Sequence, residues 1–418
     1  MSAVETQLES ATDRGLHRYT IYGAVLAGAG LPIYIHAPKF FNESYGISLT
    51  AIAGVLVLLR MFDFIQDPLL GWVADRLGRA RGVVAATITV ILGASMVALF
   101  AVPAPIEPLW WFVLCLAVLF TSFSFLWILF YARGIAKGET LGANGPLRLA
   151  AWREFGTLLG ICLASIVPSL LMMSGLADPL VAFSIGFFAA AVVAAIVMAP
   201  EWAGRLDVSE TGTWQLLRDK ILRQLLVVGL FNAAPVAVSA SLFLFYVEYR
   251  LGDAAAAGPL LLVFFVAAAA TAPFWSRMAE SRGTKETLIL GMVLAIVSFS
   301  FAIFLGDGDV WIFALICLAS GAALGADMTL LPALFSRRVD QVKGAGGQAF
   351  GLWNFCSKLT LAVAAATVLP LLDAAGFTNE GNNPPEVLMT LTVLYAVVPS
   401  GLKVIALCVL YWTPIEER

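Results

Sequence analysis

Charged residues are scarce in this sequence. Asp, Glu, Lys and Arg make up 13% of its 418 residues, whereas 60% belong to the hydrophobic set. A soluble globular domain has about 25% charged residues, so that class of protein is excluded. The basic residues form no terminal arm and no patch interleaved with aromatic residues, which excludes a nucleic-acid partner. The composition therefore indicates an integral membrane protein in a lipid bilayer.

Cysteine is also rare, and its spacing is uninformative for chemistry. The five cysteines are far apart, lie within apolar runs and form no C-x-x-C pair: Cys115, Cys162, Cys317, Cys356 and Cys408. We expect them to be small buried hydrophobes that form neither disulfides nor a metal site.

The sequence also lacks the usual motifs of catalysis. It has no nucleophile and base arrangement, no metal-ligand cluster and no Walker-type loop. The glycine-rich stretch 344–351 enters an apolar run and follows no strand, so its likeness to a phosphate-binding loop is superficial. We therefore predict a protein that is not an enzyme and has no cofactor. An ion gradient is the energy source left to it.

Long apolar runs are what the sequence does have. There are twelve, each near the length of about 20 residues that crosses a hydrocarbon core. They lie at about residues 19–36, 47–73, 83–102, 109–131, 147–172, 180–198, 221–246, 254–275, 288–305, 310–335, 349–372 and 387–412. The predicted fold class is an all-α membrane protein with twelve transmembrane helices.

Basic residues concentrate in the loops that follow the even-numbered runs. These loops hold Arg76, Arg79, Arg81, Arg133, Lys137, Arg205, Arg218, Lys220, Arg277, Arg282, Lys285, Arg337, Arg338 and Lys343. The opposite loops hold only Lys39 and Arg250. By the positive-inside rule both termini are cytoplasmic, and we expect a bacterial inner membrane.

A polar loop divides the runs into two sets of six. We predict an N-terminal six-helix bundle at residues 1–200, a cytoplasmic linker at 201–220 and a C-terminal six-helix bundle at 221–418. Two pseudo-symmetric, parallel halves suit a transporter that rocks one bundle against the other around a midplane site.

The second apolar run carries three charges. On a helix, the offsets of three and seven place Arg60, Asp63 and Asp67 on one face. A charge in hydrocarbon costs at least a few kcal/mol, so this face must look into protein or a wet cavity.

The loop after this run has a recognisable motif. Its glycines, acid and arginines fit G-x-x-x-D-R-x-G-R-x-R: Gly71, Asp75, Arg76, Gly78, Arg79 and Arg81. In this the chain resembles the major facilitator superfamily over essentially its whole length. The resemblance implies two six-helix bundles and a cytoplasmic gate formed by these loop residues.

The run itself fits a narrower motif, R-x-x-D-x-x-x-D-P-x-x-G, from Arg60 to Gly71. This resembles the glycoside, pentoside and hexuronide cation symporters, the family of the melibiose permease, and lysolipid symporters are similar too. The resemblance implies that Asp63 and Asp67 hold Na⁺ or H⁺. It also implies that Lys358, in the eleventh run, couples ion binding to movement, and we expect Arg60 to take part in this coupling.

The chemistry of the embedded acids agrees with an ion site. Two carboxylates one turn apart repel each other in a low-dielectric site, and a cation or proton relieves that repulsion. Na⁺ needs about five or six oxygens, so Gln66 and Thr121 or Ser122 would have to help. Lys358 would pair with an empty acid. The alternative is a static network in which Arg60, the two acids and Lys358 neutralise one another.

The substrate-choosing positions depart from the sugar-binding members. Neither the stretch 24–33 nor the stretch 120–127 has an acid where those members do. Arg153 and Trp127 do match family positions in the fifth and fourth spans. We predict a substrate site from Arg153, Trp127, Asp327 and Asn354.

Several of these residues have competing interpretations. Asp327 could bind substrate, carry a second proton or cap a broken helix. Arg153 could bind an anionic group or snorkel, and it should not satisfy Glu154, because adjacent residues point about 100° apart on a helix. Lys403 is expected to be a snorkelling anchor.

We therefore predict a cation-coupled secondary transporter, a monomer that symports a small organic solute such as a glycoside by alternating access. The coupling ion is Na⁺ or H⁺, and antiport stays open. One alternative is a symporter of lysolipids or other amphiphiles on the same fold. The other is a transport-inactive sensor or assembly factor.

Overall fold

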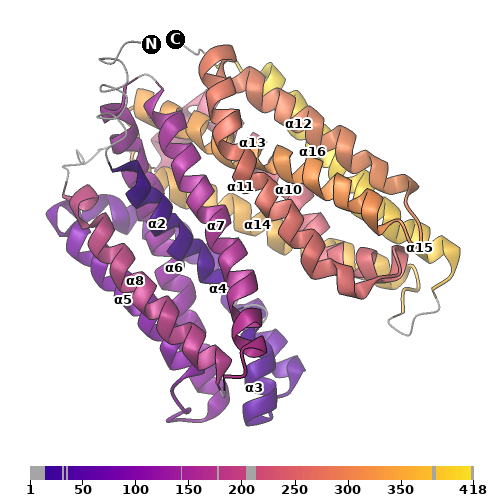
Figure 1. The fold of residues 1–418 in the computed structure, drawn as a ribbon. Helices are drawn as coiled ribbons and strands as arrows, with labels where there is room; N and C mark the ends of the chain where they lie inside the picture. The colour runs from indigo at the N-terminus through magenta and orange to yellow at the C-terminus, as the bar shows by residue number, and fades with distance from the viewer. Residues whose placement is uncertain are drawn as a thin grey trace. The chain divides into compact units, whose positions relative to one another are not determined.

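A computed structural model describes residues 15–30, 33, 36–142, 144–176, 178–203, 213–378 and 383–415. Every regular element among these residues is a helix (Figure 1). The helices group into two compact units. The first unit comprises Met1–Thr213 and Val339–Asn354, and the second comprises Trp214–Arg338 and Phe355–Arg418.

The described residues of the first unit form α2 (Leu16–Gly28), α3 (Ala37–Tyr45), α4 (Leu49–Arg76), the 3₁₀ turn η2 (Gly78–Ala80), α5 (Arg81–Phe100), α6 (Pro108–Thr140), α7 (Gly145–Met173) and α8 (Pro179–Trp202). It also takes in the first turns of α14 (Gly346–Ala374). Helix α4 begins at a Ser48 cap, whose hydroxyl accepts the N–H of Ala51 at 3.2 Å.

Helix α9 (Thr213–Arg218) begins at the last residue of the first unit and leads into the second. The second unit continues with α10 (Lys220–Phe245), η3 (Tyr246–Arg250), η4 (Ala254–Ala256), α11 (Ala257–Arg282), α12 (Thr284–Ser300), η5 (Phe301–Phe304), α13 (Val310–Gln341), the rest of α14, α15 (Pro385–Thr392), η6 (Val393–Val397) and α16 (Val398–Trp412).

Ten helices in the described part of the chain are long and apolar enough to cross a membrane. They match the third to twelfth predicted spans, and the protein is an integral membrane protein. The other two predicted spans, 19–36 and 47–73, fall on α2 and α4. Residues 31, 32, 34 and 35 of the first span lie outside the described residues.

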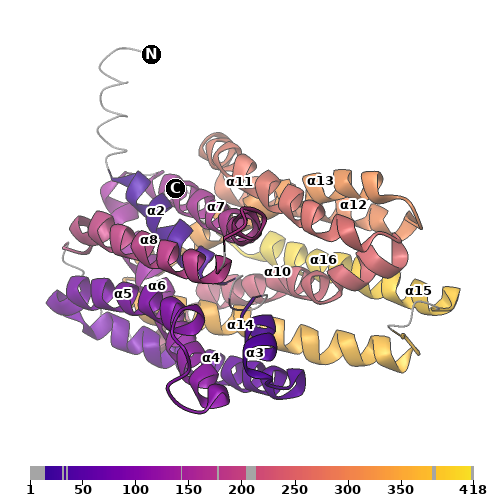
Figure 2. The same ribbon diagram turned by 60° about the horizontal axis from the view of Figure 1, so that its bottom comes forward.

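Glycines let α2 and α7 approach closely in the first unit. A Cβ on Gly156 would lie 2.1 Å from the carbonyl oxygen of Thr20, and one on Gly160 would lie 2.1 Å from that of Ala24. Such contacts are shorter than any side chain allows, so only glycine fits. The two helices lie side by side in Figures 1 and 2, as do α5 and α8.

Two π-helical turns meet in the core of the second unit. Tyr246 of η3 stacks on Tyr395 of η6 with ring centroids 4.1 Å apart and an interplanar angle of 14°. The Tyr246 hydroxyl donates to the carbonyl oxygen of Ala302 at 2.6 Å. Single π turns of this kind interrupt α-helices, often beside functional sites.

An ion pair ties the start of α10 to the end of α13. Asp219 caps α10 by accepting the N–H of Leu222 at 2.8 Å. Its two oxygens also accept Arg338 Nε at 3.1 Å and Nη2 at 2.6 Å. Burial by itself raises the pKa of Asp219, but the hydrogen bonds and charge of Arg338 outweigh it, so that the net pKa is lowered.

Candidate functional site

The predicted acids of α4 lie in a buried polar cluster. Asp63 is 2% exposed, Gln66 is 8% exposed and Asp67 is fully buried. Gln66 lies one turn after Asp63, and its Nε2 donates to Asp63 Oδ1 at 3.0 Å. The structure therefore places both acids and the amide in the protein interior, as the cost of charge in hydrocarbon requires.

Helix α6 completes this cluster with two hydroxyls. Thr121 Oγ1 donates to Gln66 Oε1 at 3.1 Å, and Ser124 Oγ donates to Asp63 Oδ1 at 2.8 Å. Thr121 was expected from the sequence, but Ser124 was missed in favour of Ser122. The spacing could have found it, because residues three apart share a helix face whereas adjacent ones do not.

Asp63, Gln66, Asp67, Thr121 and Ser124 are called the α4–α6 cluster below. Two carboxylates, an amide oxygen and two hydroxyls are hard oxygen donors of the kind that alkali cations take. Among the described residues, no group of three or more His, Cys, Asp or Glu could hold a metal ion. A cation here would therefore be held by two acids together with neutral oxygens.

The predicted coupling residues lie in different units. Arg60 is half-buried on α4 in the first unit. Lys358 is 9% exposed, on the part of α14 that belongs to the second unit. The lysine is thus buried in the protein, and its coupling to the acids stays a prediction.

Asp75 of the predicted gate caps the N-terminus of α14. Its Oδ1 accepts the backbone N–H of Gly347 at 2.7 Å and its Oδ2 accepts that of Gln348 at 2.8 Å. A carboxylate is favoured here because the first N–H groups of a helix lack partners and carry positive charge. Asp75 therefore holds the start of α14 against the end of α4.

Glycines bring these two backbones together. A Cβ on Gly71 would lie 2.4 Å from the carbonyl oxygen of Gly347, and one on Gly351 would lie 2.8 Å from that of Asp67. The motif glycine Gly71 is thus required by close packing rather than by backbone conformation. The start of α14 passes directly over the turn that carries Asp67.

Three other predicted gate residues, Arg76, Gly78 and Arg79, are exposed. The Arg76 guanidinium lies 3.8 Å from the ring centroid of Trp72, and Arg79 is exposed. Gly78 has a φ of 49°, in the left-handed region that favours glycine. Arg81 is buried, and its Nη2 donates to the carbonyl oxygen of Ala74 at 3.3 Å. The loop motif therefore divides into a packed part, Gly71, Asp75 and Arg81, and an exposed part, Arg76, Gly78 and Arg79.

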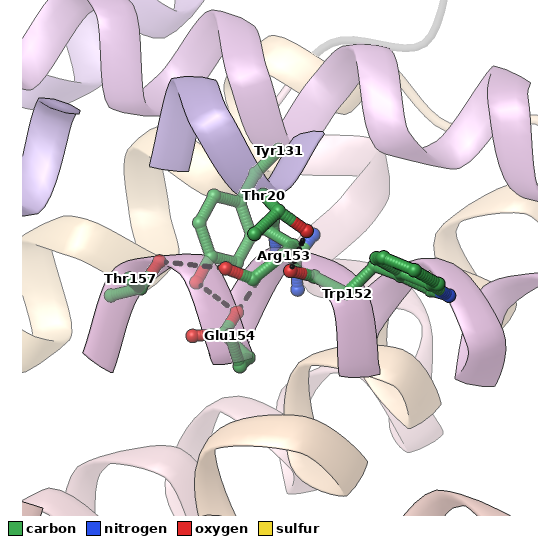
Figure 3. A network of polar contacts seen from close by, with 6 residues as sticks. All are labelled: Thr20, Tyr131, Trp152, Arg153, Glu154 and Thr157. Carbon is green, nitrogen blue, oxygen red and sulfur yellow. Dashed lines mark hydrogen bonds and ion pairs between the residues drawn. The ribbon is translucent and has the colours of Figure 1, made fainter. Parts of the chain in front are cut away.

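Arg153 belongs to a second buried network, shown in Figure 3. Its Nε donates to Glu154 Oε1 at 2.8 Å, and the Tyr131 hydroxyl donates to the same oxygen at 2.7 Å. The guanidinium also lies over the Tyr131 ring, 3.6 Å from its centroid. The expectation that Arg153 and Glu154 do not satisfy each other was wrong, because both long side chains bend toward Tyr131.

Trp127 lies beside this network. Its ring stacks on Phe123 at 5.4 Å and lies 5.3 Å from the ring of Tyr131, one turn further along α6. The structure therefore gathers two predicted substrate contacts, Arg153 and Trp127, around Tyr131. Sequence reasoning missed Tyr131 and Glu154.

Asp327 lies in the second unit and has a different kind of partner. Lys403 Nζ donates to Asp327 Oδ2 and, at 2.6 Å, to Asn232 Oδ1. Helix α13 continues unbroken around Asp327, so the interpretation as a cap of a broken helix was wrong. Lys403 is 4% exposed, and the expectation of a snorkelling anchor was also wrong. Asn354 is buried in the first unit, so the structure does not gather all four predicted substrate contacts in one unit.

The fold and these embedded charges define a membrane transport protein, and comparison with known proteins agrees. The family described as MFS/sugar transport protein matches residues 19–417. The chain belongs to this family, which is one of transporters and not of enzymes. The family predicted from the motifs at residues 60–81 is confirmed.

Two curated relatives match over part of their length. The Sodium-dependent lysophosphatidylcholine symporter 1 of Gallus gallus is 27% identical over 202 residues, covering 46% of this chain and 38% of the relative. The Glucuronide carrier protein homolog of Escherichia coli (strain K12) is 29% identical over 191 residues, covering 44% and 41%. The matched region thus spans less than half of each relative.

Solved structures share the fold over nearly the whole chain. The E. coli fucose:proton symporter has a TM-score of 0.69 at 14% identity, covering 94% of this chain and 97% of that one. An outward-facing bacterial homologue of the iron transporter ferroportin has a TM-score of 0.68 at 12% identity, covering 94% and 99%. At these identities the likeness shows the fold alone, and the predicted major facilitator fold is confirmed.

Proposed function

We propose that this protein is a Na⁺-coupled symporter of a small organic solute that works by alternating access. The α4–α6 cluster is the observation that carries the proposal. Asp63 and Asp67 supply the negative charge, while Gln66, Thr121 and Ser124 supply neutral oxygens from two helices. A proton needs only one carboxylate, so this collection of oxygens favours Na⁺ over H⁺.

The names of the relatives support both parts of the proposal. One relative is called sodium-dependent, and the two names give organic cargoes, a lysophosphatidylcholine and a glucuronide. In this chain the solute would contact Arg153 and Trp127 in the first unit, with Asn354 and Asp327 as further contacts.

Movement is coupled to the ion through charge and packing. In the proposed cycle Lys358 and Arg60 compensate the acids when Na⁺ is absent, and Na⁺ binding releases Lys358. Asp75, with Gly71, Arg76, Gly78 and Arg79, forms the cytoplasmic gate. Asp75 accepts hydrogen bonds from the N–H groups of Gly347 and Gln348, and Lys358 lies three turns further along the same helix. A movement of Lys358 would therefore reach these hydrogen bonds, which supports the role of Asp75 in the gate.

The location and oligomeric state that we propose are those expected from the sequence. We propose a monomer in a bacterial inner membrane with both termini in the cytoplasm, because the basic loops follow the even-numbered spans.

The test is gradient-driven uptake into proteoliposomes. The probes are 4-nitrophenyl β-D-glucuronide and a palmitoyl lysophosphatidylcholine, each with an inward Na⁺ gradient, an inward H⁺ gradient or none. We expect the Na⁺ gradient to accelerate uptake of one probe at least about tenfold, which corresponds to a lowering of the transport barrier by about 1.4 kcal/mol or more. Asp63→Asn or Asp67→Asn should each remove this acceleration.

Asp373→Asn is the matched control, because it removes an exposed acid near the end of α14 and should leave uptake unchanged. Acceleration by Na⁺ that persists in both cluster variants would show that the ion site lies elsewhere. Acceleration by the H⁺ gradient alone would show that the coupling ion is a proton.

A further inference from the structure

A cavity of about 170 Å³ lies within the second unit. Helices α10, α11, α12, α13 and α16 all contribute to it, together with the π turn η6. Most of its wall is apolar, and five aromatic rings line it: Phe243, Phe264, Phe265, Phe299 and Tyr395. The α4–α6 cluster contributes no residue to this wall.

One end of the cavity is charged, because both Asp327 and Lys403 line it. Lys403 is held by two acceptors, Asp327 Oδ2 and Asn232 Oδ1. Asp327 Oδ1 is buried and has no hydrogen-bond partner among the described residues. The pair is neutral as a whole, which is the condition for burying two charges beside aromatic rings.

Two of the three serines of the wall, Ser320 and Ser400, are already used by their own helices. Ser320 Oγ donates to the carbonyl oxygen of Ile316 at 2.6 Å, and Ser400 Oγ donates to that of Ala396 at 2.7 Å. A polyhydroxylated ring would leave many of its hydroxyls without partners here, which is costly when they are buried. The wall therefore suits an apolar or aromatic group that carries a single charge.

The hydrogen-bond partners of Asp327 and Lys403 indicate whether the charged group of the ligand is an anion or a cation. An anion at Lys403 keeps the cavity neutral if Asp327 takes up a proton, and a cation at Asp327 keeps it neutral if Lys403 loses one. The ammonium of Lys403 has Asn232 as a second acceptor, which holds it in place when Asp327 is exchanged. Asp327 Oδ1 accepts no hydrogen bond among the described residues, so a proton can be added there without displacing a donor.

We propose that this cavity binds an amphiphilic anion, whose apolar group lies among the aromatic rings and whose carboxylate replaces Asp327 at Lys403. One proton from solution moves to the Asp327 carboxylate for each anion bound, so that charge balances. This assignment goes beyond the proposed transport function, because it gives the second unit a binding site made entirely by its own residues. The other titratable groups of the wall, Cys317 and Tyr395, are neutral below about pH 8.

The test uses purified full-length protein without any ion gradient. The probe is 4-phenylbutyrate, compared with 4-phenylbutan-1-ol and 4-phenylbutylamine, which keep the phenyl ring and chain but carry a neutral or a positively charged head group. Titration calorimetry in two buffers of different ionisation enthalpy gives both affinity and proton uptake. We expect the acid to bind at least tenfold more tightly than the alcohol or amine, with about one proton taken up per anion.

Variants separate the two roles of the pair. Lys403→Met should weaken binding of the acid at least tenfold, and Asp327→Asn should keep binding while proton uptake falls to zero. Because Lys403→Met alone leaves a buried acid, the neutral double variant Asp327→Asn/Lys403→Met provides a second measurement, and it too should bind the acid at least tenfold more weakly.

Asp373→Asn removes an exposed acid on α14 and is the matched control, which should bind the acid as the unmodified protein does. The titrations contain no Na⁺, so that failure of the ion site and failure of this cavity are told apart. Equal affinity for acid and alcohol, tighter binding of the amine, or acid binding without proton uptake would each overturn the proposal. So would unchanged acid binding in the double variant.

Discussion

The two units each bury acids, but they satisfy them in different ways. On α4 and α6, a hydroxyl and an amide, which carry no charge, donate hydrogen bonds to Asp63. In the second unit, Asp327 is bonded by the ammonium of Lys403. Neutral donors orient a carboxylate without cancelling its charge. An ammonium cancels that charge, and the acid then has to be exchanged or protonated before it can do anything else.

The largest effect expected from this difference is on stability. Lys403→Met leaves Asp327 buried without its counter-charge and should destabilise the protein by about 3–5 kcal/mol. Asp63→Asn keeps an oxygen that accepts from Ser124, and Asp67 remains as an acid for Lys358 in the proposed cycle, so the substitution should cost only about 1 kcal/mol. Thermal unfolding of the purified variants measures both. Adding Asp327→Asn to Lys403→Met should recover most of the loss, and equal losses in the two single variants would remove the distinction between the units.

The next effect is the response of stability to Na⁺. At a Na⁺ concentration about 100 times its Kd, binding to the folded state alone stabilises by about 2.7 kcal/mol. We expect Na⁺ to raise the unfolding temperature of the unmodified protein and of Asp327→Asn, and to leave that of Asp67→Asn unchanged. Choline chloride at the same ionic strength controls for screening. A rise of equal size in Asp67→Asn would contradict the assignment.

A smaller effect should come from the neutral oxygens. Ser124→Ala removes a hydrogen bond to a carboxylate and a candidate ligand, so Na⁺ affinity should fall about tenfold, or about 1.4 kcal/mol. Ser122→Ala is the matched control, since Ser122 is a buried serine on the same helix two residues earlier. Equal affinities in these two variants would show that the hydroxyl of Ser124 does not contribute.

The smallest effect concerns an ion pair outside the membrane spans. The pKa of Asp219 is lower in the folded protein than in the unfolded chain, where it is about 3.9. Its pairing with Arg338 therefore stabilises the protein at any pH above the unfolded-state pKa, and this stabilisation is lost as the pH falls through the folded-state pKa. Asp219→Asn should therefore be less stable at pH 7, by about 1 kcal/mol or less for a partly exposed pair. Its unfolding temperature should approach that of the unmodified protein in strong acid. A difference in unfolding temperature between Asp219→Asn and the unmodified protein that does not change with pH would contradict this prediction.

The first unit was the more predictable of the two, because its acids follow local spacing. The offsets on α4 were enough to place Asp63 and Asp67 together in the interior, and the loop motif was enough to single out Gly71 and Asp75. What α4 cannot specify is the register of α6 against it. Once Thr121 is chosen, the spacing along α6 favours Ser124 over Ser122, and that step was the one missed.

The second unit was less predictable, because its charged pair joins residues 76 positions apart on different helices. No local pattern links Asp327 to Lys403. The depth of Lys403 in the last span was nevertheless a usable signal, since a lysine far from a helix end needs a buried partner. Arg153 and Glu154 show that even neighbouring residues can be predicted wrongly from helix geometry. Helix geometry gives the direction of Cβ, and long side chains can still converge on a third residue.

The most direct test of the central claim is equilibrium binding of radioactive ²²Na⁺ to the purified protein. A site made by the α4–α6 cluster predicts saturable binding of one Na⁺ per chain in the unmodified protein and in Asp327→Asn. Binding should be lost in Asp63→Asn and Asp67→Asn. Saturable Na⁺ binding that survives both of these substitutions, or that is absent from the unmodified protein, would contradict the account.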